Sequence, residues 1–482
     1  MKNLLPPSLV RNALSGHSWL GLLTGALMYL ICLSGTLVVY YQYLERWEQP
    51  NVPEYRQLAP TLVGHAYRNV LSQPQQVSGD MLIMLPTEES PHAYVASSIG
   101  TWFLQPDGRR GEPVAHPWTD MLGNLHLYLH LPSTFGMVVV SAFGALLCAL
   151  LLSGFLAHPR IFRDAFNLRL GGSRRLEQVD IHNRLSVWGA PFHLMIGITG
   201  AYFGLAALMN TIIAAAFFDG DRDAATGAIH SPAPVLQQEV APMNVQGALE
   251  RMNEVAPEAE PFYITIEDIN TPGQYMIIGG RHHDRLIYGE QYRFDQQGEY
   301  LGKAGYTDGP GGQQAIFSTY RIHFGHFGGY TMLILYGVFG LALTVVSVSG
   351  INIWLARRKR RDYLNNLWTG LVWGTPPALA LTALLAVLTS GAATAVYFWG
   401  TLVFSMGLAQ WLDNDWRTRL VLQRCTAGLV FAVVAGHLAL FGRDSLSNSA
   451  ALAVNTSLLL TGIAFLYLAS RQRQFATPYS SR

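Results

Sequence analysis

Long uncharged stretches alternate with polar segments along the chain. Four of them exceed the roughly 20 residues that cross a bilayer core, at 19–44, 131–157, 185–218 and 324–356. A fifth run, 365–412, is long enough for two spans with a turn near Ser390-Gly391, and two shorter runs follow at 425–442 and 450–470. The pattern therefore predicts a mainly α, polytopic membrane protein with eight transmembrane helices.

Composition agrees with a membrane protein. Half of the 482 residues are apolar and 13% are charged, whereas a soluble globular chain carries roughly 25% charged residues. The net charge of +1 is uninformative about nucleic acid, and no nucleic-acid partner is expected because the basic residues form short clusters and not a broad face. Cys32, Cys148 and Cys425 all lie in apolar runs, which excludes a disulfide framework and a cysteine-rich metal site.

Basic clusters predict the orientation in the lipid. Arginines crowd residues 160–184 and 357–361, and the positive-inside rule places both segments in the cytoplasm. Eight spans then put the N-terminus, the basic loop before 425 and the basic tail on that same side. Residues 45–120 and 219–320 are expected outside.

The two outer segments have the same pattern. Each opens with an amphipathic helix, at 62–71 and 245–255, and continues as alternating strands with turn signals such as QPDGRRGE (105–112) and FDQQGEY (294–300). Both predict small α+β domains. The expected segments are a first span (1–44), an outer domain (45–120), two spans with a basic loop (121–218), a second outer domain (219–320), a fourth span (321–362) and four C-terminal spans (363–482).

An internal repeat relates the first two spans to the next two. His17 precedes Gly35 of the pair Ser34-Gly35 by 18 residues, and His182 precedes Gly200 of Thr199-Gly200 by the same number. We call His17 and His182 the inner histidines, because both are expected at the cytoplasmic boundary. The Ser/Thr-Gly pairs themselves are interpreted as close-packing points between helices.

Four further histidines are expected at the other boundary, and we call them the outer histidines. His130 and His326 each lie 24 residues ahead of the glycine of a Ser-Gly pair, Gly154 and Gly350. His126 and His323 lie 28 and 27 residues ahead of the same glycines, a difference that a bend beside Pro132 would absorb.

Two halves that both start in the cytoplasm are related by an axis along the membrane normal. A planar cofactor near that axis would meet one histidine from each half, which is the geometry of bis-histidine haem. His193 lies 11 residues after His182, and its repeat equivalent is Met28, so these two form a third candidate ligand pair. The alternative is that the histidines only anchor or pack helices.

Several segments resemble the PepSY-associated transmembrane family, also called iron-regulated membrane proteins. They are HPRIFRDAFNLR (158–169), VDIHNRLSVWGAPFHLMIGITG (179–200), GHSWLGLLTG (16–25), LHLYLHLPSTFG (125–136) and IHFGHFGG (322–329). The resemblance covers roughly residues 10–362. It implies four helices with two periplasmic PepSY domains in a bacterial inner membrane. It also implies bound haem, as in the ferrisiderophore-reductase members of the family. His17, His182, His193 and the four outer histidines fall on the family's histidine positions.

The leading hypothesis is therefore a transmembrane ferric reductase with two haem b groups, acting on ferric siderophore. The chain has no nicotinamide or flavin fingerprint, which predicts an external electron donor, either a quinol or a cytoplasmic reductase. The alternatives are a non-catalytic PepSY membrane module that binds a partner protein, or a component of an iron-chelate transporter. Few charged residues within the spans count against the transporter. The four C-terminal spans hold almost no candidate ligands and receive no role.

Overall fold

The computed structural model describes residues 5–73, 77–166, 173–358, 360–389, 391 and 393–474. Ser390 of the predicted turn and the end of the HPRIFRDAFNLR segment, 167–169, lie outside these residues. The chain divides into two compact units. The membrane unit comprises Met1–Pro50, His116–Leu205 and Gly329–Arg482, and the sheet unit comprises Asn51–Ala115 and Ala206–Gly328.

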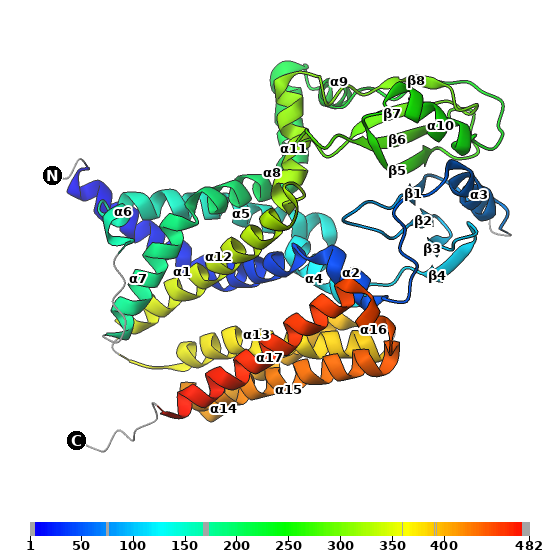
Figure 1. Cartoon of the computed structure of the whole chain (residues 1–482). Coiled ribbons are helices and arrows are strands. Elements are labelled where there is room, and N and C mark those ends of the chain that lie inside the picture. The colour runs from blue at the N-terminus through cyan, green and yellow to red at the C-terminus, as the bar shows by residue number, and fades with distance from the viewer. Residues whose placement is uncertain are drawn as a thin grey trace, which may run out of the picture. The chain divides into compact units, whose positions relative to one another are not determined.

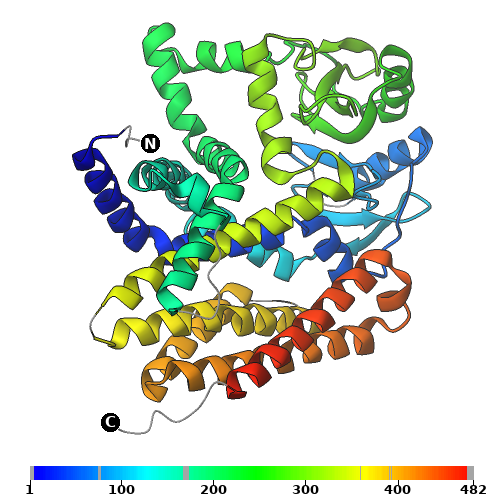
Figure 2. The same ribbon diagram turned by 60° about the vertical axis from the view of Figure 1, so that its left-hand side comes forward.

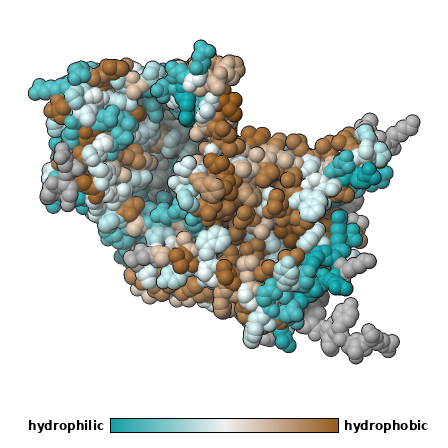
Figure 3. Space-filling view, turned by 180° about the vertical axis from the view of Figure 1, so that it is seen from behind, coloured by the Kyte–Doolittle hydropathy of each residue, from teal (hydrophilic) through white to brown (hydrophobic). Residues whose placement is uncertain are grey.

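Eight helices in the described part of the chain are long and apolar enough to cross a membrane, which confirms the predicted number. They are α1 (Pro7–Val38), α5 (Ser133–Ala157), α8 (Ala190–Phe217), α12 (Gly329–Arg357), α13 (Tyr363–Leu388), α14 (Thr394–Leu412), α15 (Asp415–Phe441) and α17 (Ser449–Gln474) (Figure 1). Apolar side chains dominate the outer face of these helices (Figure 3). An apolar helix surface of this kind fits a lipid environment.

Five shorter helices connect the spans of the membrane unit. They are α2 (Tyr41–Glu48), α4 (Pro117–Tyr128), α6 (Ile161–Asp164), α7 (Arg174–Trp188) and α16 (Asp444–Ser447). Helix α4 ends in a turn at Leu129 and His130, both left-handed with φ of 54° and 57°. Pro132 precedes α5 and cannot donate a backbone hydrogen bond, so the chain breaks here between two helices. This is the bend that the unequal histidine spacing predicted.

The four C-terminal spans form a bundle in which α13 packs on α14 and α15, and α15 packs on α17 (Figures 1 and 2). We call residues 363–482 the C-terminal bundle. Pro376 has no N–H to donate to the carbonyl of Val372 four residues earlier. The Tyr29 hydroxyl of α1 donates to that carbonyl at 3.0 Å. The carbonyl that the proline leaves without a helical donor thus forms a contact between the bundle and α1.

A second, fully buried contact joins the bundle to α2. The indole N–H of Trp47 donates to Asn455 Oδ1 at 2.9 Å, and His437 Nε2 donates to the Trp47 carbonyl at 2.7 Å. The rings of Trp47 and His437 are stacked with their centres 4.8 Å apart. Buried polar groups that find each other in this way specify one docking arrangement. His437, which had no predicted partner, therefore has a structural role.

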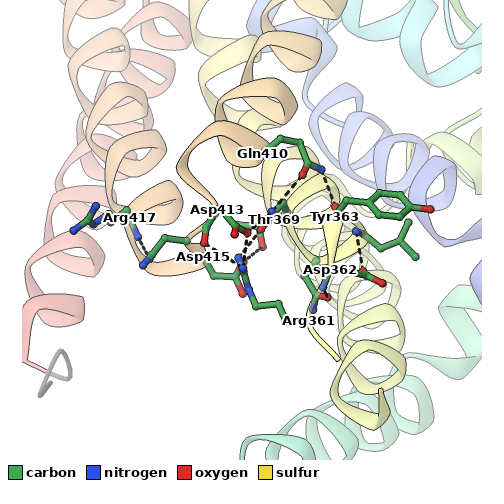
Figure 4. A network of polar contacts seen from close by, with 12 residues as sticks. Arg361, Asp362, Tyr363, Thr369, Gln410, Asp413, Asp415 and Arg417 are labelled. Atoms are coloured by element: carbon green, nitrogen blue, oxygen red, sulfur yellow. Dashed lines mark hydrogen bonds and ion pairs between the residues drawn. The ribbon is translucent and has the colours of Figure 1, made fainter. Parts of the chain in front are cut away.

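At the other end of the bundle, an ionic network connects its helices (Figure 4). Arg361 donates to the carboxylates of Asp413, just after α14, at 2.7 Å and of Asp415, the first residue of α15, at 3.0 Å. Asp362 caps α13 by accepting from the backbone N–H of Leu364. The network therefore ties the start of α13 to the following helix pair.

The sheet unit contains one eight-stranded antiparallel sheet with the order β4-β3-β2-β1-β5-β6-β7-β8 (Figure 1). Its strands are β1 (Met81–Met84), β2 (Tyr94–Ser97), β3 (Gly100–Leu104), β4 (Arg110–Pro113), β5 (Glu260–Glu267), β6 (Tyr275–Arg281), β7 (Glu290–Phe294) and β8 (Tyr300–Lys303). The two four-stranded halves join edge to edge through β1 and β5, where Ile83 is paired with Ile264. This pairing protects one edge strand of each half.

Helices α3 (Pro60–Leu71) and α10 (Val245–Val255) cover the sheet, as their amphipathic patterns predicted. The unit also contains α9 (Arg222–Ile229) and α11 (Gly311–Phe324). Val70, Met252, Ile83 and Ile264 are among the fully buried side chains of their shared core. The two α+β segments expected from the sequence are therefore joined in one core.

Candidate functional site

The inner histidine of the first half is held by a neighbouring span. His17 of α1 donates from Nδ1 to the carbonyl of Leu150 in α5 at 3.0 Å, and its Nδ1 lies 3.3 Å from the Ser153 hydroxyl. A carbonyl only accepts, so the proton is on Nδ1 and Nε2 keeps its lone pair. Gly154 leaves room for the ring, since a Cβ there would lie 3.2 Å from His17 Cε1.

The second half repeats this arrangement. His182 of α7 donates from Nδ1 to the Val346 carbonyl of α12 at 3.1 Å, and the Ser349 hydroxyl lies 3.0 Å from the same nitrogen. Gly350 occupies the place that Gly154 has in the first half. Metal-binding histidines usually donate their second ring nitrogen to a carbonyl in this way, which fixes the tautomer and the ring direction.

The two inner rings lie edge to face, and the distance between their centres fits one metal ion held by two imidazoles. Their centres are 6.2 Å apart and their planes are nearly perpendicular, at 82°. An imidazole nitrogen binds a first-row metal at about 2.0 Å, and the ring centre lies roughly 1.1 Å behind it, so two imidazoles in line across one ion have centres about 6.2 Å apart. The Nε2 atoms of His17 and His182 have no hydrogen-bond partner among the described residues. This separation fits bis-histidine ligation.

Each of these histidines occupies what we call a histidine seat: a helix carbonyl, a serine three residues later and a glycine four residues later. The serine hydroxyl donates to the same carbonyl, at 3.1 Å in Ser153 and 3.0 Å in Ser349. The glycine admits the imidazole edge. The seats are the Ser-Gly pairs of the repeat, so these pairs orient histidines as well as bringing helices close together.

A third seat lies in α1 and holds an outer histidine. His126 of α4 donates from Nδ1 to the Ile31 carbonyl at 3.0 Å, and the Ser34 hydroxyl donates to the same carbonyl at 3.1 Å. A Cβ on Gly35 would lie 2.5 Å from His126 Cε1. In α8 the spacing recurs at Ile196, Thr199 and Gly200, where the Thr199 hydroxyl lies 3.4 Å from the Ile196 carbonyl.

A cavity of about 600 Å³ opens beside the inner histidines. Apolar side chains and glycines of α1, α5 and α12 form much of its wall, and both inner histidines line it. Two cations, Arg175 and Arg357, also line it, and among its described lining residues there is no acidic side chain. An apolar space lined by imidazoles and by two guanidinium groups fits a flat apolar molecule that carries carboxylates at one edge.

Met28 and His193, the third predicted pair, line the same cavity. Both are buried, and neither ring nitrogen of His193 has a hydrogen-bond partner among the described residues. A buried imidazole without a partner is costly. The structure thus brings these two residues to one cavity, and their joint role as ligands stays a prediction.

His130 differs from His17, His182 and His126, because it does not occupy a seat. Its Nδ1 accepts from the indole N–H of Trp399 in α14 at 2.9 Å, and its Nε2 donates to the Met121 carbonyl at 2.9 Å. Both ring nitrogens are therefore used by protein groups. No sequence signal pointed to Trp399, because it lies 269 residues away in a segment without candidate ligands.

His323 and His326 belong to the sheet unit, at the end of α11. Arg321 donates to the His326 carbonyl at 2.7 Å. Burial, reinforced by the positive charge of Arg281, lowers the pKa of His326 to about 4. The imidazole is neutral at pH 7, as iron ligation requires. The predicted pairings of the outer histidines across the two halves stay predictions.

A cluster of acidic side chains lies between α2 and the start of α4. Glu48 accepts from the backbone N–H groups of Trp118 and Thr119, at 2.8 and 2.9 Å, and so caps α4. Burial raises the pKa of Glu48 to about 7. Burial, together with the charges of Asp120 and Glu48, raises the pKa of Glu45 to about 8. Both carboxyl groups thus retain protons well above the usual range.

These raised pKa values predict a stability that falls with rising pH. An unfolded glutamate ionises near pH 4.3, whereas folded Glu45 keeps its proton to about pH 8, so folding becomes less favourable between these values. Glu45→Gln should flatten the fall of the thermal unfolding midpoint between pH 5 and pH 8. Glu88→Gln, at an exposed position, is the matched control. If the unfolding midpoint falls equally steeply with pH in the wild type, Glu45→Gln and Glu88→Gln, this prediction is contradicted.

Comparison with known proteins identifies the family. The sequence pattern of the PepSY-associated TM region matches residues 14–357, well over half of the chain. The chain belongs to the PepSY-associated transmembrane family. The match includes all eight predicted ligand residues and the three occupied histidine seats, and the C-terminal bundle lies beyond it. This confirms the family that the histidine-bearing segments resembled.

A protein of Pseudomonas aeruginosa (strain ATCC 15692), named Uncharacterized protein PA4219, is 41% identical to this PepSY-associated transmembrane protein over 100 residues. The match covers 20% of this chain and 25% of that relative.

Two features of the site were absent from the sequence-based prediction, the seats as histidine holders and the contact between Trp399 and His130. The repeated Ser-Gly pairs carried the signal for the seats, since they were already the anchors of the histidine alignment.

Proposed function

We propose that this protein is a transmembrane haem-dependent reductase that passes electrons across a bacterial inner membrane to ferric iron held by a siderophore. The observation that carries the proposal is the 6.2 Å separation of the His17 and His182 rings, each held by a seat. The N-terminus is assigned to the cytoplasm and the sheet unit to the periplasm, in agreement with the basic clusters.

Bound b-type haem would supply a one-electron carrier at the inner histidines. The chain contributes the rest of the site. His17 and His182 provide two neutral imidazoles, the seat carbonyls hold their tautomers, and the apolar cavity wall excludes water. Arg175 and Arg357 at the rim match the charge of two carboxylates.

We also propose, from the sequence repeat alone, a second haem b at the outer histidines, His126 or His130 and His323 or His326. His126 has the stronger support, because it occupies a seat of the same construction as the inner histidines. The third pair, Met28 and His193, is buried beside the inner site, where it shortens the path between the two levels.

The substrate assignment rests on coordination chemistry. Hard oxygen ligands of a siderophore bind ferric iron far more tightly than ferrous iron, so adding one electron loosens the complex and leaves the chelator intact. The electron comes from an external donor, a quinol or a reduced cytoplasmic flavoprotein, which is oxidised in turn.

The test uses purified full-length protein in sealed proteoliposomes with a lipid-soluble quinol and ferric siderophore on one side. A ferrous-iron chelator reports the product. Reduction that depends on the quinol and is lost in His182→Ala supports the proposal. A haem-free wild-type protein that reduces no siderophore contradicts it and favours the partner-binding module.

A further inference from the structure

The C-terminal bundle contacts helix α4 near the start of that helix. Trp118 Nε1 donates to the Leu379 carbonyl of α13 at 3.2 Å. The Thr394 hydroxyl at the start of α14 lies 3.4 Å from the Pro117 carbonyl. Pro117 also packs closely on Gly391, where an added Cβ would lie 2.2 Å from the Cβ of Pro117. Two helices of the bundle thus hold the first turn of α4.

The bundle also contacts the chain just after α4. Trp399 of α14 donates its indole N–H to His130 Nδ1 at 2.9 Å, and because an indole only donates, the proton of His130 must be on Nε2. That nitrogen donates back to the Met121 carbonyl of α4 at 2.9 Å. His130 therefore links α14 to α4 through both sides of its ring.

The backbone around His130 strengthens this link. Leu129 and His130 both have positive φ, a conformation that side chains other than glycine rarely adopt. The N–H of His130 donates to the Asn124 carbonyl at 3.3 Å, which closes the end of α4. A strained turn of two residues persists only when its surroundings hold it, and here Trp399 and Met121 do so.

Helix α4 also carries His126, two turns from its start and about one turn before His130. His126 has the construction of the inner histidines: Nδ1 on the Ile31 carbonyl and the ring edge over Gly35. His126 in α4 and His130 just after it are thus held in different ways. His126 is oriented by a seat, and His130 is held by hydrogen bonds at both nitrogens.

We propose that the C-terminal bundle positions α4 through Trp399 and His130, and that His126 is the α4 ligand of the outer haem while His130 is a positioning residue. The ligand assignment rests on the proposed function. The positioning of α4 by the bundle does not depend on haem. This assigns a role to the segment that lies beyond the matched family region.

The first experiment measures amide hydrogen exchange of α4 in full-length protein in nanodiscs. Trp399→Phe removes the indole N–H and keeps an aromatic ring, and loss of one hydrogen bond should speed exchange in the last turns of α4 by about fivefold. Trp411→Phe, on the same helix with an 80% exposed side chain, is the matched control and should leave α4 unchanged. Unchanged α4 exchange in Trp399→Phe would overturn the positioning role.

The second experiment counts haem per chain and records the low-spin electron paramagnetic resonance signals of three variants. His130→Gln and Trp399→Phe should both keep the wild-type haem content and shift one of the two signals. His126→Gln should lose that signal. Loss of a haem in His130→Gln, with haem retained in His126→Gln, would overturn the ligand assignment. Haem-free wild-type protein would instead defeat the proposed function, and the exchange experiment would still decide the role of the bundle.

Discussion

Replacing His17 or His182 with Ala is expected to remove about half of the bound haem, because each variant loses one of the two inner imidazoles. The outer haem should remain in both variants. The seat on the neighbouring helix stays intact in each variant, but one of the two imidazoles that would hold the iron is gone. Haem per chain, measured as the pyridine haemochrome, and the loss of one low-spin signal give the result.

His158→Ala is the matched control. His158 also lines the cavity, and it lies 3.7 Å from Asp164 and not in a seat. It should therefore keep the full haem content. Equal haem in the His17, His182 and His158 variants would show that the inner histidines hold no haem, however close their rings lie.

Gly35→Ala is expected to remove the outer haem without altering any ligand. A Cβ at this position would lie 2.5 Å from Cε1 and 2.8 Å from Nδ1 of His126, so the imidazole must leave its seat. Overpacking of this kind typically costs about 1–3 kcal/mol, whereas alanine in place of glycine otherwise favours a helix. Haem content and the outer low-spin signal measure the effect.

Two other glycines serve as controls for this prediction. Gly400→Ala, on α14 with no atom within 4 Å of the new Cβ, should keep both haems. Gly123→Ala lies on α4 itself with no atom within 4 Å of the new Cβ, and should keep both haems. If Gly35→Ala retains its outer haem as these controls do, the seat does not orient His126.

Much of the fold followed from the sequence because apolar runs and amphipathic repeats are local signals. Eight spans and the helices at 60–71 and 245–255 appeared where the pattern predicted them. The pairing of β1 with β5 was not predicted, since it joins residues such as Ile83 and Ile264 that are far apart in the chain. Strand order across such a distance has no signature in local periodicity.

The candidate site was likewise predictable in part from the sequence. The repeat spacing placed His17 and His182 at equivalent positions, and the structure brings their rings to 6.2 Å. The spacing alone did not distinguish His126 from His130. That difference depends on which atoms the ring nitrogens meet, the Ile31 carbonyl in one case and Trp399 in the other. A tertiary contact from an unrelated segment therefore distinguishes the hydrogen bonding of the two histidines.

We expect His17 and His182 to bind one haem iron between them. Resonance Raman and low-temperature electron paramagnetic resonance spectra of purified wild-type protein and of His182→Ala measure this. The wild type should show six-coordinate, low-spin bis-imidazole haem, and the variant should lack one such species. A colourless wild-type protein, or haem spectra that do not change in His182→Ala, would contradict it.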